Sequence, residues 1–201
     1  MSLISIKKPA DDVILGLWKI EEAEEDYYKA YPFLSDFKSE VEKFKSNSRK
    51  LEYLSVRALL YEMTKDAFLV IRHDNNGKPL VRGFNISISH TCGWSVVLLS
   101  QTKLVGVDIE YISDRVDKVA SHFLRKDEVA DTTENRLKIW CIKETVYKLF
   151  SSDALKYTDM RAFKIKEGYA MVINYKRNIA VPVQYEVNKD FILTFSFCQG
   201  N

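Results

Sequence analysis

The sequence predicts an α+β protein with two similar lobes, each an antiparallel sheet packed against helices. Each half of the 201-residue chain has one amphipathic helical stretch, at residues 51–63 and 139–150. Each half also has a run of segments in which apolar and polar residues alternate, as they do in strands. A chain of this length can form one large domain or two small lobes with a substantial core. We expect an N-terminal lobe at residues 1–105 and a C-terminal lobe at residues 106–201.

The composition is that of an ordinary folded protein. Hydrophobic residues make up 46% and charged residues 29%, which argues against disorder. The net charge of +2 gives no reason to expect a nucleic-acid partner. The three cysteines form no CxxC pair, so we expect reduced thiols in a cytoplasm rather than disulfides or zinc. No signal segment is recognisable at the N-terminus, and no apolar run approaches the ~20 residues of a membrane span.

The N-terminal half begins with a strand-like segment at residues 12–20. The helix at 51–63 follows a lysine-rich stretch, and a short strand at 68–71 leads into an Asn-Gly turn. Two alternating segments, 84–91 and 94–100, form a hairpin that continues into residues 104–110. We expect this meander to place His90 in the same sheet as Asp108 and Glu110.

The C-terminal half begins with a segment of helical character at residues 116–137, in which Asp127 and Glu128 are expected to be exposed. The helix at 139–150 follows. The tail then reads as four core strands without candidate chemistry, at residues 162–165, 170–175, 181–187 and 191–197.

The candidate chemistry lies in two short motifs. In Gly106–Glu110 (GVDIE) the aliphatic residues alternate with Asp108 and Glu110, so a strand projects both carboxylates from one face. In the helix, Ile139, Ile142, Val146 and Phe150 recur as a buried stripe. Trp140, Glu144 and Lys148 are spaced four apart along its flank.

Neighbouring carboxylates repel each other unless a cation lies among them. Mg²⁺ binds through a few carboxylates and takes further ligands from substrate phosphates, and Lys148 suggests such a polyanion nearby. The alternative is a solvated strand face beside an ordinary Glu144–Lys148 helix pair, which stabilises by only ~0.2–0.5 kcal/mol.

GVDIE, followed some thirty residues later by W-x-x-K-E-x-x-x-K, resembles the signature pair of the 4'-phosphopantetheinyl transferase superfamily. The more similar type is the larger, monomeric one, which includes the enzyme that activates surfactin synthetase. Gly-Lys-Pro at 77–79 and Ile-Ser-His-Thr at 88–91 resemble further motifs of that family. Residues 122–128 resemble its R-F-F-S-x-x-E, with His122 in place of arginine and Leu124 in place of phenylalanine. The similarity covers roughly residues 49–150.

The resemblance implies an α+β, two-lobed fold and a Mg²⁺-dependent transferase. The 4'-phosphopantetheine group of coenzyme A passes to a serine of an apo acyl or peptidyl carrier protein, and 3',5'-ADP is released. Asp108, Glu110 and Glu144 are then the expected metal ligands. Glu144 is also the expected base, directly or through a water, and Lys148 neutralises phosphate charge. A monomer suffices for such a two-lobed chain.

The same resemblance assigns nucleotide-phosphate contacts to Arg57, Lys78 and His90. Taken from the residues alone, each has another reading. Arg57 lies in an apolar half of its helix and pairs equally well with a core carboxylate, Lys78 is a solvated turn lysine, and His90 is structural. The basic stretch at 38–50 is either a solvated face or a surface for an acidic carrier protein.

Two further points stay open. Glu128 is as well suited to a structural pair with Lys143 as to catalysis, and residues 151–156 replace a glycine-containing loop usual in the family. Two other functions are also compatible with the residues. One is a Mg²⁺-dependent phosphohydrolase or nuclease built from the same carboxylates. The other is a catalytically silent module that binds coenzyme A or a carrier protein.

Overall fold

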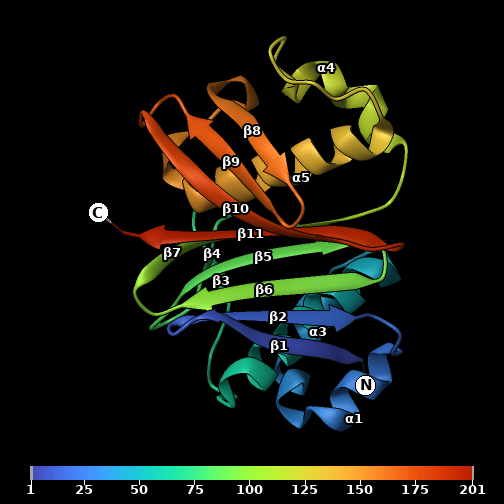
Figure 1. The fold of residues 1–201 in the computed structure, drawn as a ribbon. Coiled ribbons are helices and arrows are strands. Elements are labelled where there is room, and N and C mark those ends of the chain that lie inside the picture. The colour runs from blue at the N-terminus through green and yellow to red at the C-terminus, as the bar shows by residue number, and fades with distance from the viewer. Residues whose placement is uncertain (1, 201) are drawn as a thin grey trace. The chain divides into compact units, whose positions relative to one another are not determined.

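The computed structural model describes residues 2–200 and divides the chain into two compact units, Met1–Thr102 and Lys103–Asn201. Each unit has an antiparallel sheet covered by helices (Figure 1), which confirms the predicted α+β class. The division falls after Thr102, because strand β7 (Lys103–Tyr111) belongs entirely to the second unit. The boundary that we expected, between residues 105 and 106, lies inside this strand. Within the described part of the chain, no helix is both long and apolar enough to span a bilayer.

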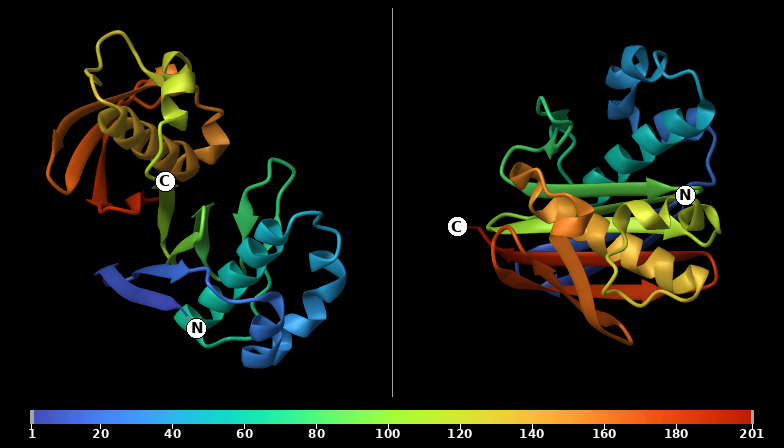
Figure 2. Two further views of the ribbon diagram at one scale, coloured as in Figure 1. Left: turned by 90° about the vertical axis from the view of Figure 1, so that its right-hand side faces the viewer. Right: turned by 90° about the horizontal axis from the view of Figure 1, so that it is seen from above.

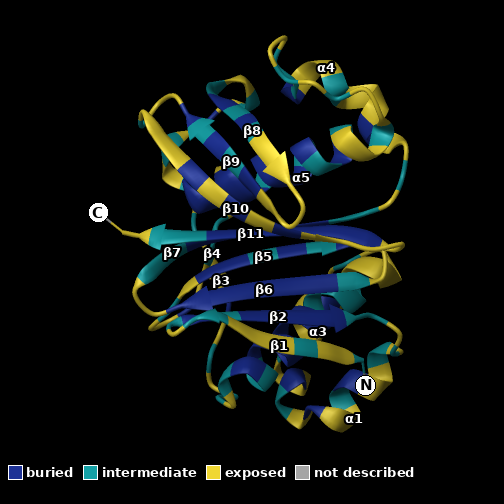
Figure 3. Ribbon diagram, in the orientation of Figure 1, coloured by how far each residue is buried: buried dark blue, intermediate teal, exposed yellow. Residues whose placement is uncertain are grey.

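The sheet of the N-terminal unit has the strand order β1-β2-β6-β5, and all neighbours are antiparallel. Its strands are β1 (Leu3–Ala10), β2 (Val13–Lys19), β5 (Asn85–Thr91) and β6 (Trp94–Ser100). The strands predicted at residues 12–20, 84–91 and 94–100 correspond to β2, β5 and β6. The edge strand β1 was not predicted from the sequence. Figure 3 shows β2 and β6 largely buried and β1 largely exposed.

The helices of this unit are α1 (Glu24–Ala30), the 3₁₀ helix η1 (Pro32–Phe37), α2 (Lys38–Val41) and α3 (Asn47–Thr64). Helix α3 contains the predicted helix and starts earlier, because the Ser46 hydroxyl accepts a hydrogen bond from Arg49 N at 3.2 Å and caps it. It packs on one face of the sheet, against β2 and β6 (Figure 2). Gly16 in β2 leaves room there for Leu59 and Met63.

The predicted strand at residues 68–71 is wrong. This segment contains no strand, and Phe68 is 87% exposed. Asp66 Oδ1 accepts a hydrogen bond from Phe68 N at 2.8 Å, which bends the chain directly after α3. The predicted turn follows between two short strands, β3 (Arg72–His73) and β4 (Pro79–Leu80).

The sheet of the C-terminal unit has the antiparallel order β7-β11-β10-β9-β8. The four predicted tail strands are confirmed as β8 (Met160–Lys166), β9 (Tyr169–Asn174), β10 (Ile179–Val187) and β11 (Phe191–Gln199). β7 pairs along its whole length with β11, and β5 belongs to the other sheet. The expectation that His90 shares a sheet with Asp108 and Glu110 is therefore wrong.

Helix α5 (Thr133–Leu149) lies along one face of this sheet and contacts β7 and β11 (Figure 1). The four residues of its predicted stripe, Ile139, Ile142, Val146 and Phe150, are all buried. The Thr132 hydroxyl accepts from Asn135 N at 3.1 Å and caps the helix. Two short 3₁₀ helices, η3 (Ser151–Asp153) and η4 (Tyr157–Asp159), follow it.

The segment at residues 116–137, for which we predicted helical character, is helical only in part. The segment forms the 3₁₀ helix η2 (Arg115–Val119), the short helix α4 (Ala120–Phe123) and an irregular stretch before α5. The side chain of Glu128 causes the interruption, because it turns inward and is completely buried. It accepts from the backbone N–H groups of Arg125 at 2.9 Å and Ala162 at 2.6 Å.

Candidate functional site

The candidate site is the crossing of β7 and α5 within the C-terminal unit. Gly106 allows this crossing to be close. A Cβ at this position would lie 2.2 Å from the carbonyl oxygen of Thr145 and 2.9 Å from Leu149 Cβ. Only glycine fits here, because the helix backbone itself fills the space that a side chain would need. The first residue of GVDIE therefore brings the two motifs together.

Asp108 is buried, and its Oδ1 accepts from Lys148 Nζ at 2.6 Å. Lys148 thus pairs with the strand, and not with Glu144 along the helix as in the alternative interpretation of the motif. Burial lowers the pKa of Lys148, but Asp108 and Glu144 raise it by more, so the ammonium stays charged.

Glu110 lies on the same face of β7 as Asp108 and also reaches α5. Its Oε1 accepts from the indole Nε1 of Trp140 at 2.9 Å. Burial, and then the neighbouring Asp108, raises the pKa of Glu110 to about 7. The tryptophan of the second motif therefore holds a carboxylate of the first.

Glu144 projects from α5, and its Oε1 accepts a short hydrogen bond from the hydroxyl of Tyr157 in η4. Burial and then Asp108 raise the pKa of Glu144 as well. The centre of the Tyr157 ring lies 5.0 Å from that of the Trp140 ring. The Phe123 ring packs edge-to-face against Trp140, with 5.1 Å between the ring centres. Tyr157 was missed by sequence reasoning, because nothing in its spacing relates it to Glu144.

Lys143 and Glu128 form a completely buried ion pair with 2.7 Å between Nζ and Oε2. The remaining protons of Lys143 go to the carbonyl oxygens of Phe123 at 2.7 Å and Tyr157 at 3.3 Å. The structural pairing is confirmed. The pair ties the stretch before α5 and the loop after it to the helix that carries Glu144.

The loop at residues 151–156, which departs from the family pattern, is also firmly held. Arg177 donates two hydrogen bonds to the Asp153 carboxylate, at 2.5 and 2.8 Å. Lys176 Nζ donates to the carbonyl oxygens of Asp153 at 3.0 Å and Ala154 at 2.8 Å. Within this loop Ala154 adopts a left-handed conformation, with φ of 48°, which glycine would adopt at less cost.

Asp108, Glu110 and Glu144 fit a hard divalent cation by the chemistry of their oxygens. Burial, and then the neighbouring Asp108, raises the pKa of Glu110 and of Glu144, and a cation bound there would favour the ionised forms of both. Each side chain is nevertheless turned to a protein donor, and among residues 2–200 no three His, Cys, Asp or Glu side chains are gathered as a metal-binding group. The magnesium site stays a prediction.

The N-terminal unit contains a pocket of about 340 Å³ at α3. Two of the three predicted phosphate contacts, Arg57 and His90, line it, together with Arg49, Glu52, Tyr53 and neighbouring residues. Lys78 is not among its lining residues. Its backbone N–H donates to Asp74 Oδ1 at 2.9 Å within the turn, and any role of its side chain stays a prediction.

Arg57 has no carboxylate partner within ion-pair distance in the described chain. Its guanidinium lies 3.2 Å from the centre of the Tyr53 ring and 5.1 Å from that of Phe37, and Nη1 donates to Tyr53 O at 3.2 Å. Burial lowers the pKa of Arg57 to about 10, so the guanidinium stays cationic. Its buried Nε has no hydrogen-bond partner among the described residues. A buried cation with a spare donor suits an anionic ligand.

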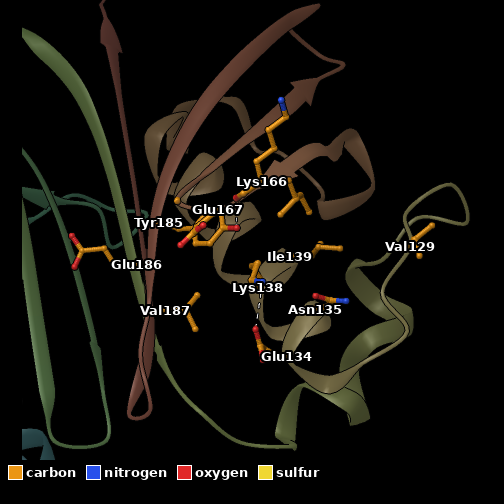
Figure 4. Close-up of a pocket in the computed structure, with 12 residues that line it drawn as sticks. Val129, Glu134, Asn135, Lys138, Ile139, Lys166, Glu167, Tyr185, Glu186 and Val187 are labelled. Carbon is orange, nitrogen blue, oxygen red and sulfur yellow. Dashed lines mark hydrogen bonds and ion pairs between the residues drawn. The ribbon is translucent and has the colours of Figure 1, made fainter.

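A larger pocket of about 800 Å³ lies in the C-terminal unit between α5, the β8–β9 turn and β10 (Figure 4). Ile139, Val187 and Tyr185 contribute apolar surface, and Lys138 pairs with Glu134 at 3.5 Å. None of the predicted site residues lines it.

Two comparisons with known proteins bear on this geometry. Residues 104–196 match the family model of the 4'-phosphopantetheinyl transferase superfamily. A relative from Aneurinibacillus migulanus, 4'-phosphopantetheinyl transferase gsp, is 29% identical over 124 residues, which cover 57% of this chain and 51% of the relative. The chain thus matches about half the length of this relative. The family predicted from the two motifs is confirmed for residues 104–196, the segment that is similar to the 4'-phosphopantetheinyl transferase superfamily.

Proposed function

We propose that this chain transfers 4'-phosphopantetheine from coenzyme A to a serine of an apo acyl or peptidyl carrier protein and releases 3',5'-ADP. The observation that carries the proposal is the β7–α5 crossing, where Asp108, Glu110, Glu144 and Lys148 meet inside the segment that matches the family. The site is the charge-compensating arrangement that phosphoryl transfer needs, since catalysis of that reaction rests mainly on positioning and electrostatics.

In this reaction the serine oxygen forms a bond to the phosphorus that carries pantetheine, and the bond from that phosphorus to 3',5'-ADP breaks. Glu144 accepts the serine proton, directly or through a water. Its place on α5, with Oε1 facing the Tyr157 hydroxyl, supports this role. Lys148 offers positive charge to the phosphate oxygens from its place beside Asp108.

Asp108, Glu110 and Glu144 would hold the magnesium ion. When bound, the ion would neutralise negative charge on the pyrophosphate of coenzyme A. The raised pKa values of Glu110 and Glu144 support this assignment, because bound cations favour the ionised forms of both groups.

Arg57 and His90 are assigned to the nucleotide phosphates, with Lys78 as a further contact. Arg57→Ala should raise the coenzyme A concentration needed for half-maximal rate by about tenfold, because a hydrogen-bonded charge contact typically contributes ~1.5–3 kcal/mol. The steady-state KM for coenzyme A measures this. If only the melting temperature changes, Arg57 is a structural residue.

The acceptor is proposed to be an acidic carrier protein that meets the basic stretch at residues 38–50. Part of that stretch is already engaged within the unit, since Lys50 pairs with Glu24 at 3.3 Å and Lys38 lies over the Tyr28 ring. The remaining lysines are available for steering, which salt would weaken.

The test is intact-mass spectrometry of an apo carrier protein after incubation with this protein, coenzyme A and Mg²⁺. The expected result is a gain of one phosphopantetheine, which EDTA abolishes and added Mg²⁺ restores. Coenzyme A binding without a mass gain, across carriers from several pathway types, would instead indicate a silent binding module.

A further inference from the structure

Strand β1 is an open edge of the sheet in the N-terminal unit (Figure 1). It pairs with β2 on one side, and no other described strand lies on its outer side. In an antiparallel sheet, backbone N–H and C=O groups of an edge strand face outward without a partner in the sheet. Such an edge is a template on which a further strand can pair.

Three aliphatic side chains of β1 are exposed to solvent. Leu3, Ile4 and Ile6 are 37%, 51% and 40% exposed. Leu3 pairs with Trp18 and Ile6 with Gly16, and directly opposite residues project from the same face of a sheet. This is the face that α3 covers, because a side chain on Gly16 would collide with that helix. The helix packs on β2 and β6, so the aliphatic residues of β1 lie beyond its cover.

The two ends of β1 have opposite charges. At the C-terminal end, Lys8 is exposed and has no ion-pair partner among residues 2–200. At the other end, the backbone N–H of Ser2 donates to Glu22 Oε1 at 2.6 Å, and its hydroxyl donates to the exposed Glu21 at 3.0 Å. Pro9 follows Lys8 and has no N–H, so strand pairing along the outer edge ends there.

An antiparallel copy of β1 complements this edge. When Ser5 lies opposite Ser5 of the second copy, Ile4 lies opposite Ile6, and Lys8 lies opposite Ser2 and therefore beside its two glutamates. Each of these contacts occurs twice, as a two-fold interface requires. The two-fold axis is perpendicular to the sheet, so Ile6 of both copies lies on the same face.

The outer edge strand of the other sheet, β8, is less suited to such pairing. It ends in two exposed lysines, Lys164 and Lys166. Lys164 also has φ of 49°, a left-handed conformation that interrupts an extended strand. Lysines and interruptions of this kind protect an edge against pairing.

We propose that β1 of one copy pairs antiparallel with β1 of a second copy, so that the two N-terminal sheets join into one. The interface has three aliphatic side chains from each copy and a short stretch of backbone, so the association is weak and reversible. The proposed transfer needs only one copy, and the inference therefore does not rest on the proposed function.

Sedimentation velocity over a wide range of protein concentration tests the pairing. We expect a reversible monomer–dimer equilibrium for the wild type. Ile4→Lys and Ile6→Lys should each weaken the dimer about tenfold or more, because every substitution occurs twice in a two-fold interface. Ile165→Lys is the matched control, since Ile165 is an exposed isoleucine on β8. Melting temperatures verify that the variants fold.

Exchange of charges tests the orientation of the two strands. Lys8→Glu and Glu21→Lys should each weaken the dimer, and the variant with both substitutions should restore it, because opposite charges then meet again at both ends. A residue that acts only on the fold of its own copy would not be rescued in this way.

A cysteine cross-link tests the register. Opposite residues of an antiparallel pair have Cα atoms about 4.5–5.5 Å apart, which a disulfide can span. In a Cys92→Ser background, Ser5→Cys should therefore form a disulfide-linked dimer on oxidation, whereas Lys8→Cys should not link to itself. A monomer at every concentration, growth beyond a dimer, a dimer lost only in Ile165→Lys, or a dimer in which Ser5→Cys does not cross-link would overturn the inference.

Discussion

The three carboxylates at the β7–α5 crossing differ chiefly in the donor that each one faces. Asp108 faces an ammonium group, Glu110 an indole N–H and Glu144 a phenol. Only the first donor carries a charge, so the other two carboxylates, which are partly buried, do not face a cationic donor. Burial and Asp108 accordingly raise the pKa values of both glutamates. Residues with such perturbed pKa values are typical of functional sites.

Tyr157 is a residue of the candidate site that neither sequence motif contains. Burial and Glu144 raise its pKa, so the phenol remains protonated and donates to the proposed base. Tyr157→Phe should lower kcat about tenfold or more with little change in KM for coenzyme A, because a hydrogen bond to a charged group contributes ~1.5–3 kcal/mol.

Steady-state kinetics of carrier-protein modification would check this prediction. Tyr147→Phe is the matched control, since its ring lies 6.0 Å from that of Tyr157 and belongs to the same aromatic cluster. An unchanged kcat in Tyr157→Phe would show that Glu144 is positioned without the phenol.

Among the elements, the crossing of β7 and α5 depends on one glycine. In Gly106→Ala the new methyl group would meet the helix backbone at Thr145 O, which cannot turn aside as a side chain could. We expect a loss of ~1–3 kcal/mol in the free energy of unfolding, as is usual for overpacked cores. Transfer activity should fall as well, because α5 carries Glu144 and Lys148.

Chemical denaturation and the transfer assay measure the two effects. Gly200→Ala is the control, since the nearest atom to its added Cβ, Leu104 Cγ, would lie 3.8 Å away in ordinary contact. Equal stability of Gly106→Ala and wild type would contradict the close crossing.

The β1–β2 turn is joined to the end of β6 by Asp12. Its carboxylate accepts from Ser100 Oγ at 2.6 Å and from the backbone N–H groups of Gln101 at 3.0 Å and Thr102 at 2.9 Å. The Ser100 and Thr102 hydroxyls are the main cause that lowers the Asp12 pKa far below its usual value of 3.8. The ionised form is therefore favoured in the folded state.

This lowered pKa makes the contribution of Asp12 to stability depend on pH. The contribution is fully present above the unfolded pKa near 3.8 and is lost as the pH falls toward the folded pKa. Asp12→Asn should have a lower melting temperature than the wild type at pH 6, and the difference between the two melting temperatures should be smaller at pH 3. Asp11→Asn, next to it in the same turn, is the control for thermal melts at both values. A gap that does not change with pH would refute the linkage.

For the whole chain, sequence pattern predicted the elements whose periodicity is strong. The strands β2, β5–β7 and β8–β11, the two amphipathic helices and the buried stripe of α5 form as expected. The joint presentation of Asp108 and Glu110 toward α5 also follows from a period of two. Such patterns succeed because one face of each element is buried in a core.

The remaining features depend on contacts between residues distant in sequence. The pairing of β7 with β11 removes His90 from the sheet of Asp108, and no local signal specifies that partner. The buried pair of Glu128 with Lys143 breaks a segment whose local pattern is helical. Tyr157 reaches Glu144 through a loop. The ion pair of Arg49 with Glu52 could have been predicted from the sequence, because the two residues are three apart on α3. The approach of Glu52 to His90 could not, because it depends on the fold.

The measurement that tests the account most directly is intact-mass spectrometry of an apo carrier protein incubated with coenzyme A, Mg²⁺ and either the wild type or Glu144→Gln. The account predicts one added phosphopantetheine with the wild type, at a rate about 10²–10⁴-fold higher than with the variant, the range typical of general base catalysis. The variant should melt no lower than the wild type, because it removes a buried carboxylate whose pKa is raised and keeps an acceptor for Tyr157. A near-normal rate in Glu144→Gln, or no modification of any carrier by the wild type, would contradict it.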